Sequence, residues 1–323
     1  MAENDVTAVP AEGQPAPKEK RHRVVLPEVE REYHQFYRTP SFRWWRPLVA
    51  LVVFVVVFYV GSQVLVKVGL FLSGVPADAI DRGEYATDTP SFVLANNVVM
   101  ASLILFVWAA HRVFFRQKIG WLSSVEGRFR WGAFWRFAGL SAPLIAVALG
   151  VQGKFQDLQL LPETWLLLAI TLLLTPLQSA GEEFLFRGFA ARAIGSWFPS
   201  RRIGLIVATV VTTVIFMLVH GAGDPWLNAF YVVLGLCASL LVWRTGGLEG
   251  AIALHVVNNV GNMLVVSFVG TKGIFDREAG ASDAWTLLNM AAVVGATALI
   301  LWQATRLGLQ SRSAPAAVEA SND

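Results

Sequence analysis

Residues 48–71 read LVALVVFVVVFYVGSQVLVKVGLF and decide the fold. This stretch carries a single charged side chain, Lys67. A helix needs about 20 apolar residues to cross the roughly 30 Å hydrocarbon core of a bilayer, and this stretch is long enough to do so. We therefore expect a transmembrane helix here, and a membrane bundle if the pattern recurs.

Seven further apolar stretches of spanning length follow it. They lie near residues 91–110, 131–150, 164–186, 203–220, 227–243, 248–269 and 284–303. Eight spans predict an all-α, polytopic membrane helical bundle with both termini on one side. Composition agrees: 55% of residues are hydrophobic and 15% are charged, against roughly 45–50% and 25% in soluble proteins. These values exclude soluble, disordered and disulfide-scaffold classes, and a net charge of +3 gives no indication of a nucleic-acid partner.

The charges between the spans predict the orientation. Segments 111–130 and 187–202 are rich in arginine, like both ends of the chain, whereas 72–90, 151–163 and 221–226 are poor in cations. Cytoplasmic loops carry an excess of Lys and Arg, so we expect both termini in the cytoplasm and the protein in the plasma membrane. No short hydrophobic segment of a cleavable signal peptide precedes the first span.

The same pattern predicts three parts of the chain. Residues 1–46 are expected to be a disordered basic cytoplasmic tail, because they are polar and contain several prolines and a basic run. Residues 47–304 are expected to form one membrane domain, and residues 305–323 a short cytoplasmic tail. The lipid bilayer is therefore a predicted partner.

Polar residues inside the spans gather in three places. Charged residues within a membrane are costly and are candidates for function. The three segments are GEEFLFRG at 181–188, FMLVH at 216–220 and HVVNN at 255–259. Any one of them has an ordinary structural explanation, but their occurrence in successive parts of one chain favours a site.

Helical spacing determines which of these side chains can meet. Residues four apart share a helix face, so Glu183 can pair with Arg187. Glu182 is turned roughly 100° from its neighbour and points elsewhere. By the same spacing, His255 shares a face with Asn259. Phe216 likewise lies one turn from His220 and can pack beneath it.

This set of residue types favours hydrolysis with water as the nucleophile. Burial raises the pKa of a carboxylate, which suits a general base near neutral pH. Imidazole can polarise the water, and an amide can donate to an oxyanion. Glu182, His220 and His255 could instead hold a metal ion if they converge. Two other functions stay open, a non-catalytic membrane scaffold or regulator of the same fold and a proton-coupled transporter.

The three motifs resemble the CPBP family of intramembrane proteases, which includes CAAX proteases, bacteriocin-processing (Abi) enzymes and the type II CAAX prenyl endopeptidase. The similarity covers about residues 160–265. It rests on Glu-Glu-x-x-x-Arg at 182–187, Phe-x-x-x-His at 216–220 and His-x-x-x-Asn at 255–259. The resemblance implies an eight-helix intramembrane endopeptidase whose site opens toward the cytosol. Its substrate would be a membrane-associated or lipid-modified protein.

The resemblance also implies roles. Glu182 would activate water and His220 would help to hold it, while His255 and Asn259 would stabilise the oxyanion. The residues that would shape the site are Glu183, Arg187 and Phe216. We expect no cofactor, because a metal-free site uses every residue; a divalent metal such as zinc is the alternative.

One expectation conflicts with simple straight spans. If one span runs inward from residue 164 and the next runs outward from residue 203, Glu182 and His220 lie near opposite edges of the bilayer. They would differ in depth by more than about 15 Å. They can meet only if a segment bends, and Pro176 is a candidate for the kink.

Overall fold

The structure, a computed structural model, describes residues 25–315. Within that range, eight helical segments are long and apolar enough to cross a membrane, which confirms the predicted all-α bundle. They are α1 (Trp45–Leu72), α3 (Pro90–Phe115), α5 (Trp131–Val151), the segment Thr164–Gly195, α9 (Arg201–Val219), α10 (Pro225–Thr245), α11 (Glu249–Val269) and α12 (Thr286–Arg306). The shorter elements are β1 (Arg31–Glu32), η1 (Tyr33–Gln35), α2 (Ala77–Arg82), α4 (Ile119–Ser123) and β2 (Arg312–Ser313).

Local sequence sets the ends of these helices. The side chain of Thr89 accepts a hydrogen bond from the backbone N–H of Phe92, and Pro90 occupies the first turn of α3, where no intrahelical N–H bond is lost. Asp224 caps α10 in the same way. At the other end of α10, Gly246 has φ +64°, a left-handed conformation that suits glycine and stops the helix.

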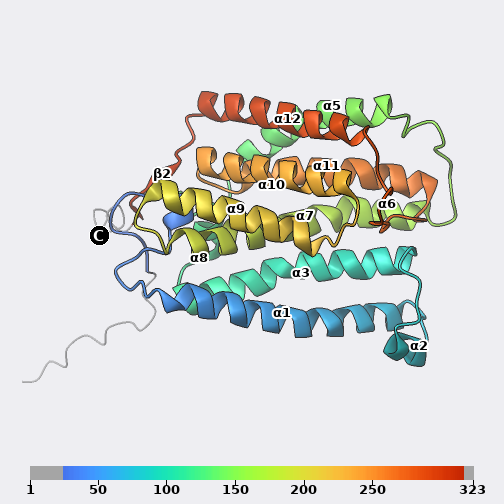
Figure 1. Ribbon diagram of the computed structural model, residues 1–323, viewed down its shortest axis with the longest axis horizontal. Helices are drawn as coiled ribbons and strands as arrows, with labels where there is room; N and C mark the ends of the chain where they lie inside the picture. Colours follow the sequence, from blue (N-terminus) through green and yellow to red (C-terminus); the bar gives the residue numbers. More distant parts are fainter. Residues whose placement is uncertain (1–24, 316–323) are drawn as a thin grey trace, which may run out of the picture.

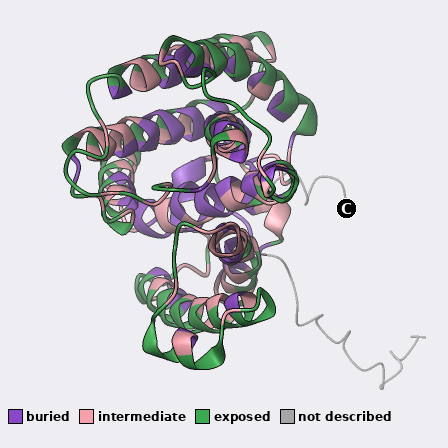
Figure 2. Cartoon of the chain, turned by 90° about the vertical axis from the view of Figure 1, so that its right-hand side faces the viewer, coloured by how far each residue is buried: buried purple, intermediate pink, exposed green. Residues whose placement is uncertain are grey.

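Helix α11 lies inside the bundle. It contacts α5, α7, α10 and α12, and its first half is almost completely buried. Figure 2 shows buried residues on the inner sides of the helices and exposed residues around the outside. By contrast, α1 packs mainly on α3 and exposes most of its surface, as a helix surrounded by lipid does.

The fourth span is broken into four pieces. It comprises α6 (Thr164–Leu173), α7 (Thr175–Glu183), the π-helix η2 (Phe184–Ala190) and α8 (Ala191–Gly195). The break between α6 and α7 precedes Pro176, which cannot donate a backbone hydrogen bond. Single π-helical turns inside α-helices are frequent at functional sites. The span also extends to residue 195, well beyond the predicted end at 186.

Residues 25–44 differ from the predicted disordered tail. Tyr33, Phe36 and Tyr37 are at most 1% exposed. The hydroxyl of Tyr33 donates to the carbonyl oxygen of Leu122, and β1 pairs with β2 near the C-terminus. The expectation of disorder over residues 1–46 is therefore wrong for residues 25–44, because three aromatic residues are enough to anchor a segment too short to show periodicity. The basic run at 18–23 lies outside the described residues.

The two ends of the described chain lie at the same end of the bundle (Figure 1). We call this end the terminal face; it carries residues 25–44, 116–130 and 246–248 together with β2. The opposite face carries the loops 73–89, 152–163, 220–224 and 270–285. The arginine-rich segments lie at the terminal face, which is the face that the charge pattern predicts to be cytoplasmic.

Candidate functional site

His255 lies between the two adjacent glutamates. Its Nδ1 is 2.8 Å from Oε1 of Glu183, and its Nε2 is 3.8 Å from Oε2 of Glu182. Oε1 of Glu183 also accepts a hydrogen bond of 3.0 Å from Arg187, as their spacing predicts. Glu183, Arg187 and His255 are at most 2% exposed and Glu182 is 8% exposed. The structure therefore brings together the predicted residues of α7 and α11.

A side chain that the motifs did not include connects Glu182 to Asn259. The amide nitrogen of Gln178 donates to Oε1 of Glu182, one helical turn away. The amide oxygen of Gln178 accepts a bond of 3.2 Å from Nδ2 of Asn259 on α11. The polar groups of the two helices thus form one connected network.

His220 approaches from α9 as part of an aromatic group. Its Nδ1–H donates to the carbonyl oxygen of Phe216 at 2.6 Å, and its ring stacks on Tyr231 with 4.0 Å between centroids. The ring of Phe216 lies edge-on to His255 at 6.0 Å, and the guanidinium of Arg187 lies 4.4 Å from its centre. Phe216 therefore packs beneath His220, as expected, and lies between the two imidazoles.

The depth conflict disappears because the fourth span is longer than predicted. Thirteen residues separate Glu182 from the end of α8 at Gly195, a rise of about 20 Å. Nineteen residues separate Arg201, where α9 begins, from His220, a rise of about 28 Å. The difference in depth falls to less than about 10 Å. Extension of the helix through η2 and α8 moves Glu182 away from the terminal face.

The alternative metal site would need Glu182, His220 and His255 to converge on one ion. Among residues 25–315, no three His, Cys, Asp or Glu side chains converge closely enough to hold a metal ion. We therefore derive no step through a metal.

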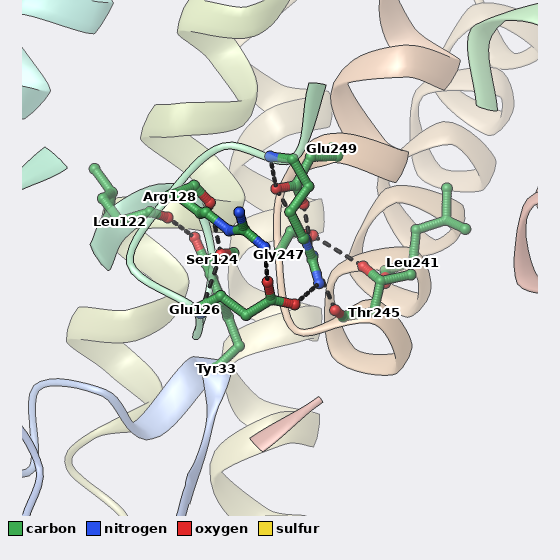
Figure 3. Close-up of polar contacts among 10 residues, drawn as sticks. Tyr33, Leu122, Ser124, Glu126, Arg128, Leu241, Thr245, Gly247 and Glu249 are labelled. Atoms are coloured by element: carbon green, nitrogen blue, oxygen red, sulfur yellow. Dashed lines mark hydrogen bonds and ion pairs between the residues drawn. The ribbon is translucent and has the colours of Figure 1, made fainter. Parts of the chain in front are cut away.

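A second buried polar cluster lies at the terminal face, at the start of α11 (Figure 3). The guanidinium of Arg130 donates two hydrogen bonds to the carboxylate of Glu249, at 3.0 and 2.7 Å, and its backbone N–H donates a third at 2.8 Å. Arg130 also donates to the carbonyl oxygen of Thr245 and to Glu126. Every charge in this Arg130–Glu249 cluster has a partner, so we assign it the structural role of fixing α11 against the loop before α5.

Eight apolar helices around a buried polar network define the class of protein: an integral membrane protein with a polar site inside its bundle. Residues 162–261 match the family described as Type II CAAX prenyl endopeptidase Rce1-like. The match spans all three motifs, confirms the resemblance and indicates a CAAX protease-type hydrolase.

The chain also resembles one curated protein over most of its length. The chain is 24% identical over 244 residues to "Uncharacterized protein YyaK" of Bacillus subtilis (strain 168). The aligned region covers 71% of this chain and 79% of that protein. No solved structure matches the chain.

Sequence reasoning missed Gln178 and Tyr231. Gln178 had a usable signal, since it is a polar residue one turn before Glu182 in an apolar span. Tyr231 had none, because an aromatic residue in a span is most often a packing residue. Its contact with His220 depends on the turn that joins α9 to α10.

Proposed function

We propose that this protein is an intramembrane endopeptidase that hydrolyses a peptide bond of a membrane-associated or lipid-modified protein with a water activated by Glu182. One observation carries the proposal: His255 lies between Glu182 and the ion-paired Glu183 in the interior of a membrane bundle. Two carboxylates with separate roles are the expected arrangement where one must remain fixed and the other must react. Oε1 of Glu183 accepts from both Arg187 and His255, whereas Oε1 of Glu182 accepts from Gln178 alone. Among residues 25–315, Oε2 of each glutamate has no hydrogen-bond partner.

The hydrogen bonds set the tautomer of His220. A carbonyl oxygen can only accept, so Nδ1 of His220 carries the proton that it donates to Phe216. In the neutral ring, Nε2 is then left as an acceptor. A water near Glu182 would give one proton to that carboxylate and direct the other toward Nε2 of His220. Its oxygen would then attack the carbonyl carbon of the substrate.

His255 and Asn259 would stabilise the oxyanion that forms. Glu182, Glu183 and Arg187 together carry one net negative charge, and protonation of His255 would neutralise the group. In that form Nε2 of His255 is a donor. Asn259 supplies a second N–H by exchanging its bond to Gln178 for one to the oxyanion. Glu182 would finally pass its proton to the leaving amine.

The decisive test is Glu182→Gln. Loss of a general base lowers the rate by about 10²- to 10⁴-fold, so cleavage should become undetectable while the protein stays folded. Comparison of membrane proteomes from cells with the wild-type protein and with Glu182→Gln should reveal accumulated precursors. A variant on the lipid-facing side, Leu218→Ala, is the matched control. Undiminished cleavage by Glu182→Gln would refute the assignment.

Metal independence has a test of its own. With the substrate found by that comparison, purified protein should cleave at an unchanged rate after treatment with a strong chelator. Loss of cleavage on chelation and its recovery with zinc would instead assign Glu182, His220 and His255 as ligands.

A further inference from the structure

The amide side chains of the site form a series of hydrogen bonds that all run in one direction. Nδ2 of Asn258 donates to Oδ1 of Asn259 at 3.0 Å, and Nδ2 of Asn259 donates to Oε1 of Gln178 at 3.2 Å. Nε2 of Gln178 then donates to Oε1 of Glu182. The series leads from α11 to the carboxylate on α7. We call these four residues the amide relay.

The charge of Glu182 sets this direction. An ionised carboxylate can only accept hydrogen bonds, whereas an amide side chain accepts at its oxygen and donates at its nitrogen. Gln178 must therefore turn its nitrogen toward Glu182 and its oxygen toward Asn259, which must donate in turn. The hydroxyl of Ser179 gives Oε1 of Gln178 a second donor at 3.1 Å and favours the same orientation. Hydrogen bonds that run in one direction strengthen one another.

Asn258 stands at the start of the relay. It is 5% exposed, whereas Asn259 and Gln178 are half-buried. It is turned roughly 100° from Asn259 around α11. Within residues 25–315, the one hydrogen bond that its side chain donates goes to Oδ1 of Asn259. Asn258 therefore acts on the site through Asn259.

The bond from Asn258 fixes which end of the Asn259 amide faces the site. Rotation of that amide by half a turn would place Oδ1 where Nδ2 lies, and an oxygen there cannot donate to an oxyanion. With Oδ1 held by Asn258, Nδ2 stays directed toward Gln178. This constraint matters most when Nδ2 leaves Gln178, because Asn258 is then the group that still holds the amide.

We propose that Asn258 is a positioning residue and that the amide relay couples the charge of Glu182 to the oxyanion donor Asn259. The inference rests on the proposed peptidase function for its reaction. When water attacks, one of its protons moves to Glu182 and its oxygen bonds to the carbonyl carbon of the substrate. The π electron pair of that carbonyl moves to the carbonyl oxygen. The negative charge thus passes from Glu182 to the oxyanion, and the total charge is unchanged.

Loss of the charge on Glu182 releases Asn259 at the step that needs it. A hydrogen bond to a charged acceptor is stronger than one to a neutral acceptor, so proton uptake by Glu182 weakens the bond from Gln178. The next bond of the relay, from Asn259 to Gln178, weakens with it. Nδ2 of Asn259 then donates to the oxyanion, while Asn258 keeps the amide in the required orientation.

A double-mutant cycle tests the role of Asn258. The assay uses the substrate found by the proteome comparison. Asn258→Leu keeps the size of the side chain but removes its donor, and it should lower kcat by about 10-fold and leave KM unchanged. In an Asn259→Ala background the same substitution should change kcat by less than about two-fold, because Asn258 acts through Asn259. An equal fall of kcat in both backgrounds, or no fall in either, would overturn the role of Asn258.

Asn262 provides the matched control. Its amide lies one turn further along α11 and donates to the backbone carbonyl oxygen of Asn258 at 2.8 Å, so it does not set the orientation of Asn259. Asn262→Leu should leave kcat per folded molecule unchanged. A fall as large as that in Asn258→Leu would overturn the proposal.

Asn258→Asp covers the case in which Asn258→Leu does not fold. It keeps the shape of the side chain, but its carboxylate can only accept and draws Nδ2 of Asn259 away from Gln178. In this variant kcat should fall at least as far as in Asn258→Leu. Full cleavage by Asn258→Asp would overturn the role of Asn258.

Proton exchange tests the coupling to Glu182 without a substrate. In full-length protein with ¹⁵N-labelled asparagine, the side-chain NMR signals of Asn259 are those that Asn259→Ala removes. Glu182→Gln imitates the neutral form of Glu182, so at a fixed pH the Nδ2 protons of Asn259 should exchange with water several-fold faster than in the wild-type protein. Asn262→Leu should show the wild-type rate. Equal rates in Glu182→Gln and the wild-type protein would overturn the coupling.

The two proposals can fail separately. Loss of cleavage in Glu182→Gln combined with full cleavage by Asn258→Leu would keep the peptidase function and reject the role of Asn258. Full cleavage by Glu182→Gln combined with faster exchange at Asn259 would reject the catalytic assignment and keep the coupling between Glu182 and Asn259.

Discussion

Glu183 on α7 and His255 on α11 are joined by a hydrogen bond of 2.8 Å between Oε1 and Nδ1, with neither side chain more than 2% exposed. The bond connects two helices that are separated by 72 positions in the chain. Oε1 of Glu183 also accepts from Arg187, so in our proposal Glu183 holds both groups in place and takes no part in proton transfer. Its neighbour Glu182 carries that role in our proposal.

The two glutamates should therefore differ in what their substitution damages. Glu183→Gln leaves the buried guanidinium of Arg187 uncompensated, and breaking a buried pair costs about 3–5 kcal/mol. Glu182→Gln keeps an amide in place of a carboxylate that has no bonded cation, so the loss should fall on cleavage. Thermal unfolding of both purified variants measures the difference. Equal destabilisation would mean that the roles are not divided in this way.

Gln178 should act as a positioning residue. Its amide bonds to both Glu182 and Asn259, and hydrogen bonds to charged groups are worth about 1.5–3 kcal/mol. Gln178→Leu should therefore lower kcat by about 10- to 100-fold. A purely structural residue would lower the unfolding temperature and leave kcat per folded molecule unchanged. The substitution Leu177→Ala, at the lipid-exposed neighbouring position, is the matched control.

The eight spans and the three motifs were predictable because each depends on local pattern. A run of 20 apolar residues identifies a helix, and spacing by four places Arg187 on Glu183 wherever the helix lies. The extension of the fourth span to Gly195 was not predictable from hydropathy, because η2 and α8 contain Arg187 and Arg192, which are buried within the protein.

The packing of residues 25–44 could not be predicted from the sequence for a related reason. Tyr33 and Phe36 stack on the guanidinium of Arg192, at 3.7 and 4.9 Å from the ring centres. The partner lies more than 150 residues away, and no local pattern links the two segments. The hydrogen bonds of Gln178 and the stacking of Tyr231 on His220 depend in the same way on how distant helices pack.

Acid should loosen the loop between α11 and α12 through Asp224. Its carboxylate accepts from the backbone N–H groups of Leu227, Gly280, Ser282 and Trp226, and these bonds hold its pKa below the usual 3.8. A carboxyl group with a lowered pKa stabilises the fold above its unfolded pKa, and that contribution disappears as the pH falls through the folded value. The protection factors of the amides at residues 277–282, corrected for the intrinsic pH dependence of exchange, should fall below about pH 4. Asp224→Asn should show the raised exchange already at pH 7, and unchanged protection there would contradict the assignment.

His34 should make the packing of residues 25–44 sensitive to milder acid. Burial lowers its pKa below the usual 6.5, against the opposing effect of Glu32, and its Nε2 lies 3.0 Å from the carbonyl oxygen of Arg201. Below pH 6.5 the detached segment takes up a proton that the packed segment excludes, so packing weakens as the pH falls. The protection factors of the amides at residues 31–37, which are corrected for the intrinsic pH dependence of exchange, should therefore be lower at pH 5 than at pH 7.5. His34→Gln should remove this difference.

The Arg130–Glu249 cluster provides the last prediction. Glu249 accepts three hydrogen bonds from Arg130 with neither group more than 8% exposed, at the first turn of the helix that carries His255. Glu249→Gln should destabilise the protein by about 3–5 kcal/mol, because a buried guanidinium loses its counter-charge. Replacing both partners, with Glu249→Leu and Arg130→Met, should recover much of that loss. Thermal unfolding of the two variants checks the order, and a double variant no more stable than Glu249→Gln would show that the bonds to Thr245 and Glu126 matter more than charge balance.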